Sequence, residues 1–190
     1  MADWARVKWS EAGQILEILK VPQDARLSDA VAPADYFQAL RQAKQRAEAV
    51  HFLGQALPRL ESVAWAARAV RDLRGDEPSA PAEARALRAT LLWVQNASEP
   101  RRRQTFDAAE ACDPTSAERL AALAAFFSGG SIAPADSPQP LPAPRDAAGR
   151  FASGAVLVAA AGRPDQAAAL DACLDAGAAM AQWGLEGADR

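Results

Sequence analysis

The stretch HFLGQALPRLESVAWAARAVRDL, residues 51–73, decides the fold. Apolar residues spaced three and four apart lead up to Leu57 and indicate one helix. Pro58 disfavours helical backbone at the residue before it but is well tolerated at the start of the next helix. Glu61 then falls in a first turn, against the positive end of a helix dipole. The stretch therefore predicts two antiparallel helices joined by a very tight corner.

Trp65 lies beside the apolar face of the second of these helices, and Arg71 lies further along it. Large aromatic side chains dominate the burial of protein cores. We therefore expect Trp65 to fill the interface between the two helices. The alternative interpretation is that Trp65 belongs to an exposed aromatic surface that binds a ligand or a partner.

Length, charge and composition limit the class of protein. The 190 residues fit one domain. The net charge of −3 gives no basic footprint for a nucleic-acid partner. Half of the residues are apolar, and many of these are alanine, the best helix former. We therefore expect helices that pack closely through alanine.

The cysteines and the apolar runs bear on location. Cys112 and Cys173 are far apart and form no CxxC motif, which favours two buried free thiols in a reducing compartment. The first nine residues carry charges and do not resemble a signal peptide. The longest apolar run, residues 155–161, is too short to span a bilayer. We expect a cytoplasmic protein without a membrane segment.

Helical periodicity and proline or polar helix starts recur along the chain. Helices are predicted to begin near residues 11, 33, 58, 80, 99, 114, 149 and 165. The helix that begins near residue 33 is expected to run to about Ala49, just before the stretch at residues 51–73. The predicted fold is all-α: a single-domain antiparallel helical bundle, or a short α-solenoid, of about eight helices with a proline-rich strap.

The chain divides into four predicted segments. Residues 1–33 form an arm and a first helix, residues 34–132 a central helical array, residues 133–148 an extended linker, and residues 149–190 a helical hairpin packed on the array. Within the linker, the proline-rich segment APADSPQPLPAPR, residues 133–145, is expected to run in polyproline-II fashion. Whether it packs on the bundle or swings free stays open at this stage.

Few residues suggest chemistry. His51 is the only histidine, so a histidine pair for a metal is impossible, and no serine motif accompanies it. The turn Ser128-Gly129-Gly130, after Phe127, offers amides that could hold an anion, but it follows a helix and is more typical of a helix stop. Arg101–Arg103 is interpreted as a solvated face. We expect no catalytic residue, metal or cofactor.

Two segments resemble an uncharacterised bacterial family. They are AEAVHFLGQALPRLESVAWAARAVRD, residues 47–72, and LAALAAFFSGGSIAP, residues 120–134. The chain differs from the family's blocks at Ala64, where a second aromatic is usual, and at Phe127, where tryptophan is commoner. The resemblance implies genes near type VI secretion components and implies no enzyme activity.

Three functional hypotheses follow. The first is a non-enzymatic accessory protein that binds a partner protein, such as an adaptor or chaperone for a secretion-machine component or effector. It would use the proline-rich segment and aromatics near Trp65 and Phe127. The second is a ligand-binding or enzymatic domain with a common pocket built from His51, Arg71 and residues 128–131. The third is a structural piece of an oligomeric assembly.

Overall fold

The computed structural model describes residues 4–189, and in this part of the chain it contains nine α-helices, two short 3₁₀-helices and no strand. The prediction of an all-α fold is confirmed. The helices are α1 (Ala12–Leu19), α2 (Pro33–Gln42), α3 (Arg46–Ala56), α4 (Arg59–Arg74), α5 (Pro81–Gln95), α6 (Glu99–Glu110), α7 (Ala117–Phe126), α8 (Ala147–Ala161) and α9 (Gln166–Trp183), with η1 (Gln23–Ala25) and η2 (Gly184–Asp189).

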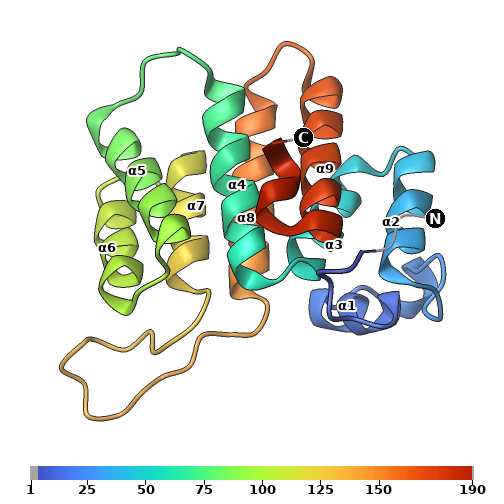
Figure 1. Cartoon of the computed structure of the whole chain (residues 1–190), viewed down its shortest axis with the longest axis horizontal. Coiled ribbons are helices and arrows are strands. Elements are labelled where there is room, and N and C mark those ends of the chain that lie inside the picture. The colour runs from blue at the N-terminus through green and yellow to red at the C-terminus, as the bar shows by residue number, and fades with distance from the viewer. Residues whose placement is uncertain (1–3, 190) are drawn as a thin grey trace.

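The helices form one bundle around the neighbouring helices α4 and α8 (Figure 1). Helices α5, α6 and α7 pack together on one side of this pair. Helices α3 and α9 pack on the other side, and α1 and α2 pack against α3. The main apolar core runs through the whole bundle, and a smaller cluster rich in alanine fills the space among α5, α6 and α7.

Trp65 of α4 lies in the middle of the main core, with 1 % of its surface exposed. Its indole Nε1–H donates a hydrogen bond of 2.7 Å to the carbonyl of Cys173 in α9. The expected core position of Trp65 is confirmed. An exposed aromatic surface at Trp65 is wrong, because α3 and α9 cover both sides of the ring through Gly54 and Gly177.

The tight corner predicted at Pro58 is present. Helix α3 ends at Ala56, Leu57 has an extended backbone, and Pro58 precedes the first residue of α4. The carbonyl of Pro58 accepts the first helical hydrogen bond from the amide of Ser62, at 2.8 Å. Proline thus ends one helix and starts the next within two residues.

The helix predicted from residue 33 into the deciding stretch is broken at Lys44, which corrects the sequence interpretation. Lys44 has a φ of 57°, in the left-handed region. The Lys44 amide donates to the carbonyl of Arg41, and the Gln45 amide donates to that of Leu40. These are the two hydrogen bonds of a Schellman helix end. Glycine usually marks such an end, so lysine in this position gave no signal.

Two helix starts also differ from the expectation. Helix α7 begins at Ala117, after Ser116, whose hydroxyl accepts from the amide of Arg119. The predicted start near residue 114 is instead a turn, because the carboxylate of Asp113 accepts from both the amide and the hydroxyl of Thr115. Helix α8 begins at Ala147, two residues earlier than expected.

The proline-rich segment connects α7 to α8 as a loop that extends away from the helices, at the lower left of Figure 1. An isolated antiparallel bridge joins Ser131 to Pro142 at the base of this loop. The amide of Ile132 donates to the carbonyl of Leu141 at 2.8 Å, and the amide of Leu141 donates to the Ser131 hydroxyl at 3.0 Å. The segment is therefore tied at its base and not laid flat across the bundle.

Glycine at position 177 is required by the close approach of α9 to the core. A Cβ atom there would lie 2.5 Å from Leu53 Cδ2 and 2.8 Å from Trp65 Nε1. We therefore predict that Gly177→Ala lowers the free energy of unfolding by roughly 1–3 kcal/mol, the usual cost of overpacking a core. Urea denaturation followed by far-UV circular dichroism measures this difference.

Gly154→Ala is the matched control in the interior of α8. The nearest atom to a Cβ there is Leu120 Cδ1 at 3.4 Å, an ordinary contact. Alanine is favoured over glycine inside a helix by about 1 kcal/mol, so this variant is expected to be neutral or more stable. Equal effects of the two substitutions would contradict the packing described for Gly177.

Candidate functional site

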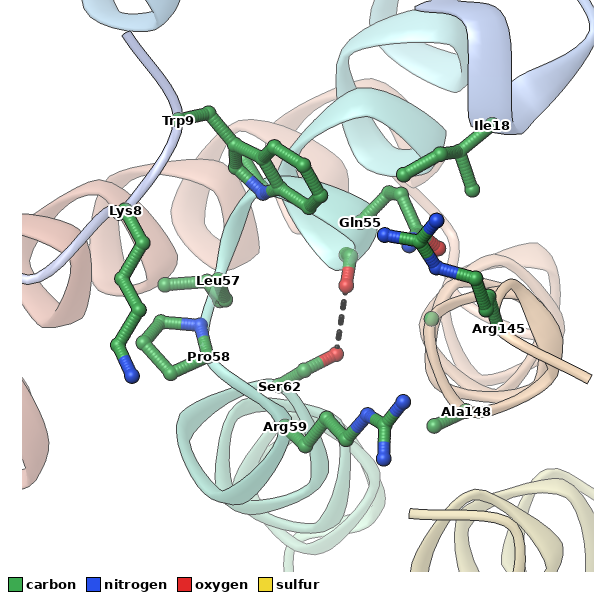
Figure 2. A pocket seen from close by; sticks show the side chains of 13 residues that line it. Lys8, Trp9, Ile18, Gln55, Leu57, Pro58, Arg59, Ser62, Arg145 and Ala148 are labelled. Carbon is green, nitrogen blue, oxygen red and sulfur yellow. Dashed lines mark hydrogen bonds between the residues drawn. The ribbon is translucent and has the colours of Figure 1, made fainter. Parts of the chain in front are cut away.

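A cavity of about 390 Å³ lies where the N-terminal arm and α1 meet the corner between α3 and α4 and the start of α8 (Figure 2). We call it the corner cavity. Its lining combines basic, apolar and small residues: Lys8, Trp9, Ile18, Gly54, Gln55, Ala56, Leu57, Pro58, Arg59, Ser62, Arg145, Ala148 and Gly149.

The floor of the corner cavity is made by the crossing of α3 and α8. Gly54 and Gly149 face each other there, and a Cβ atom at Gly149 would lie 2.9 Å from the carbonyl oxygen of Gly54. The same carbonyl accepts a hydrogen bond of 2.8 Å from the Ser62 hydroxyl of α4, drawn dashed in Figure 2. Three helices are thus fixed around one backbone position, which gives the cavity a rigid base.

A second cavity of about 560 Å³ contains His51, which the sequence analysis singled out. Its walls are mostly apolar side chains of α1, α2 and α3, and Tyr36, Glu48 and Arg150 add polar groups. Burial lowers the pKa of His51 below its ordinary value of 6.5. Glu48 raises the same pKa and Arg150 lowers it, each by a smaller effect.

Trp65 and Arg71 share a third cavity of about 300 Å³ between α4 and α9. Arg71 donates a hydrogen bond of 2.7 Å to the neighbouring Asp72. Cys173 also lines this cavity, and burial raises the pKa of its thiol to about 11. Both cysteines are free and buried, as expected. A thiol with so high a pKa is protonated at neutral pH and therefore a weak nucleophile.

The turn after α7 is a helix end, and arginine side chains donate hydrogen bonds to its carbonyls. The ring of Phe127 stacks on Phe151, with 5.1 Å between ring centroids. The Ser128 hydroxyl donates to the carbonyl of Ala125, and the Ser128 carbonyl accepts from Arg59 at 2.9 Å. Gly130 has a φ of 65°, in the left-handed region that glycine favours. The turn presents acceptors to cations, so it does not resemble an anion cradle.

The interpretation of residues 101–103 as a solvated face is wrong for Arg102. Its side chain is buried, with 3 % of the residue exposed, beside the ring of Phe126. The guanidinium donates to Glu99, to the carbonyl of Phe126 and, at 2.7 Å, to the carbonyl of Ser131. Arg103 donates to the carbonyl of Ala133 at 3.0 Å. The two arginines thus hold the base of the proline-rich segment.

A local signal for this role exists in the sequence. Glu99 precedes Arg102 and Arg103 by three and four residues, the spacing at which side chains meet on a helix. Hydrogen bonds from these arginines lower the pKa of Glu99. The carbonyls that complete the cluster come from a segment about 30 residues further along, and no local pattern indicates them.

The predicted site residues lie in three different places. His51 and Arg71 line separate cavities, and the Ser128–Gly130 turn lines neither of them. The turn is instead connected to the corner cavity through Arg59. These residues therefore do not form the common pocket of the second hypothesis.

Among residues 4–189, no group of three or more His, Cys, Asp or Glu side chains is placed to hold a metal ion. None of the helices described has both the length and the apolar character needed to cross a membrane.

The fold defines an all-α helical bundle with a loop tied at its base and a basic cavity at an interhelical corner. The chain belongs to DUF6931, a family of unknown function, which matches residues 36–181. The match includes α3–α9 and the proline-rich segment, while Lys8, Trp9 and Ile18 of the corner cavity precede it. No curated protein and no solved structure matches the chain.

The lowered pKa of His51 gives a direct prediction. The folded state binds the His51 proton less tightly than the unfolded state does. We therefore expect the free energy of unfolding to fall as the pH drops below 6.5, because His51 of the unfolded chain is protonated first. We expect the His51 ring signals in proton NMR to titrate with a midpoint below 6.5. The assignment is unambiguous because the chain contains one histidine.

The same titration in concentrated urea is the control, since the unfolded chain returns the ring to the ordinary value of about 6.5. His51 is an exposed residue whose ring is only partly desolvated at this cavity. A folded-state midpoint equal to or above the urea value would contradict that partial desolvation.

Proposed function

We propose that this protein is a non-enzymatic accessory protein that binds a partner protein through its proline-rich segment, residues 133–145. In the finer form of the proposal it is a cytoplasmic adaptor or chaperone for a type VI secretion component or effector. That finer form rests on the resemblance carried by residues 47–72 and 120–134.

The observation that carries the proposal is the way the segment is presented. Its base is fixed by the Ser131–Pro142 bridge and by the arginines of α6. Beyond this base, residues 134–136 and 138–140 are exposed, and Leu141, at the base itself, has 55 % of its surface accessible. The segment therefore combines a fixed base that presents an exposed leucine with an accessible loop beyond it.

Physical chemistry supports recognition of such a segment. The segment is not extended throughout, as the polyproline-II expectation had it, because the amide of Ser137 donates to the carbonyl of Pro134 across a turn. Its prolines still fix φ, so it has few conformations to lose and ordering it on a partner has a small entropy cost. Proline-rich segments present apolar proline rings and free carbonyls, which aromatic-lined grooves of other proteins bind. Holding the base reduces the remaining freedom further, which favours affinity through preorganisation.

Buried Arg102 adds a second argument. An arginine that is almost fully buried is unfavourable unless it is paired and hydrogen-bonded. Here its hydrogen bonds to Phe126 and Ser131 connect the end of α7 to the loop base. The arrangement stabilises one orientation of the proline-rich segment relative to the bundle, which is what a docking element needs.

The test compares copurification with the tagged wild-type chain and with Leu141→Ser, after crosslinking in cells that express the native locus. We predict that a partner copurifies with the wild type and that Leu141→Ser reduces its recovery about tenfold, the effect of removing one well-placed apolar contact. The Leu141 amide keeps its bond to the Ser131 hydroxyl, so the base of the loop is retained.

Leu92→Ser is the matched control, because Leu92 is an exposed leucine of α5, with 43 % of its surface accessible, distant in sequence from the loop. It is expected to leave recovery unchanged. The proposal fails if the wild type recovers no partner above an untagged background, or if both substitutions reduce recovery equally.

A further inference from the structure

The corner cavity has a basic lining that suggests a function separate from partner binding. Three of its lining residues are basic, namely Lys8, Arg59 and Arg145, and its lining includes no Asp or Glu. They come from the N-terminal arm, the start of α4 and the approach to α8. In Figure 2 the guanidinium groups of Arg59 and Arg145 lie on one side of the cavity, and the Lys8 ammonium lies apart from them, beside Pro58.

The three basic side chains form few hydrogen bonds or ion pairs within the protein. No hydrogen bond or ion pair is formed by Lys8 or Arg145 among residues 4–189. Arg59 donates one N–H to the Ser128 carbonyl and keeps its other donors. The acidic residues nearest in sequence to Arg59 and Arg145 are paired elsewhere: Glu61 with Arg6, and Asp146 with Arg150.

Two helix starts lie at the cavity, and each also carries a carboxylate that offsets part of its dipole: Glu61 in the first turn of α4 and Asp146 at the N-cap of α8. Helix α4 begins at Arg59 and α8 begins at Ala147, and Ala148 and Gly149 line the cavity. In neither helix does the N-cap side chain accept a hydrogen bond from the first-turn amides. Amides at a helix start have no partner within the helix, and the helix dipole makes this end positive.

Gln55 provides an independent indication of a ligand. It is 9 % exposed and lines the cavity, and its buried Oε1 has no hydrogen-bond partner. A buried acceptor without a partner costs about 1–3 kcal/mol. This unsatisfied oxygen sits beside Gly149, at the floor of the cavity. The oxygen is buried as it stands, so a ligand that fills the cavity and donates a hydrogen bond would satisfy it once the Gln55 amide turns towards the cavity.

We propose that the corner cavity binds an organic oxyanion, a carboxylate or a phosphate monoester, that also carries a hydrogen-bond donor. Arg59 and Arg145 supply planar guanidinium groups that match oxyanion geometry, and Lys8 adds a third charge. The donor of the ligand reaches the Gln55 oxygen.

The size and walls of the cavity indicate an organic ligand in place of a bare inorganic ion. A volume of about 390 Å³ falls within the range of small-molecule sites, which begins near 300 Å³. Trp9, Ile18, Leu57 and Pro58 form apolar surface beside the charges. An aromatic or aliphatic group attached to the oxyanion would pack against this surface.

The test uses the full chain and three probes: phenyl phosphate, N-benzoylglycine and benzoate. Binding is measured by isothermal titration calorimetry and by the NMR shift of the Trp9 indole. We expect N-benzoylglycine, which carries both a carboxylate and an amide donor, to bind and to move the Trp9 signal. Phenyl phosphate and benzoate both lack the amide donor, so which of these two binds tighter distinguishes a phosphate from a carboxylate site. Benzoate lacks the amide donor and should bind about tenfold more weakly than N-benzoylglycine.

Lys8→Gln and Arg145→Gln are each expected to weaken binding of the better probe about tenfold, the effect of losing one charged hydrogen bond. Neither residue is bonded in the protein, so the urea midpoint should stay unchanged. Arg85→Gln removes an exposed arginine of α5 outside the cavity and should bind like the wild type.

Raising the ionic strength should weaken binding further, because salt screens exposed charges. The proposal is overturned if neither phenyl phosphate nor N-benzoylglycine binds at millimolar concentration. It is also overturned if Lys8→Gln and Arg145→Gln bind as tightly as Arg85→Gln.

Discussion

The rest of the structure depends on the packing of Trp65 between two glycines. Gly54 of α3 lies on one side of the indole, and Gly177 of α9 lies against its Nε1 edge. The indole N–H is satisfied by the Cys173 carbonyl, so a polar atom is buried in the core without an unpaired donor. Helices α3, α4 and α9 are thereby held at separations that larger residues would not allow.

This constraint also determines the corner cavity. Gly54 approaches both Trp65 and Gly149: a Cβ atom there would lie 3.4 Å from Trp65 Cζ3 and 3.0 Å from the Gly149 carbonyl oxygen. The crossing that fixes α8 against α3 therefore also forms the cavity floor. The Pro58 corner then directs the start of α4 towards the same space. The positions of Arg59 and Gln55 follow from the core, and the cavity needs no movement to form.

Much of the fold could be predicted from local sequence, and the cavity could not. Proline starts, apolar spacing and the burial of Trp65 are local properties. The burial of Trp65 and the starts at Pro33, Pro58 and Pro81 were confirmed, whereas the start predicted near residue 114 was a turn. The left-handed helix end at Lys44 was missed because lysine gives no signal for such a backbone. Arg102 was misjudged because its acceptors come from another segment, and the basic cavity joins three distant segments, which no local period reveals.

Hydrogen exchange of the tryptophan indoles tests the central position of Trp65 most directly. The chain has five tryptophans, so the Trp65 signal can be compared with that of Trp183, which has 54 % of its surface exposed. If the glycine-flanked crossing is the most stable part of the fold, Trp65 exchanges only through global unfolding and is the slowest of the five. Exchange of Trp65 as fast as that of Trp183 would contradict this account of the fold.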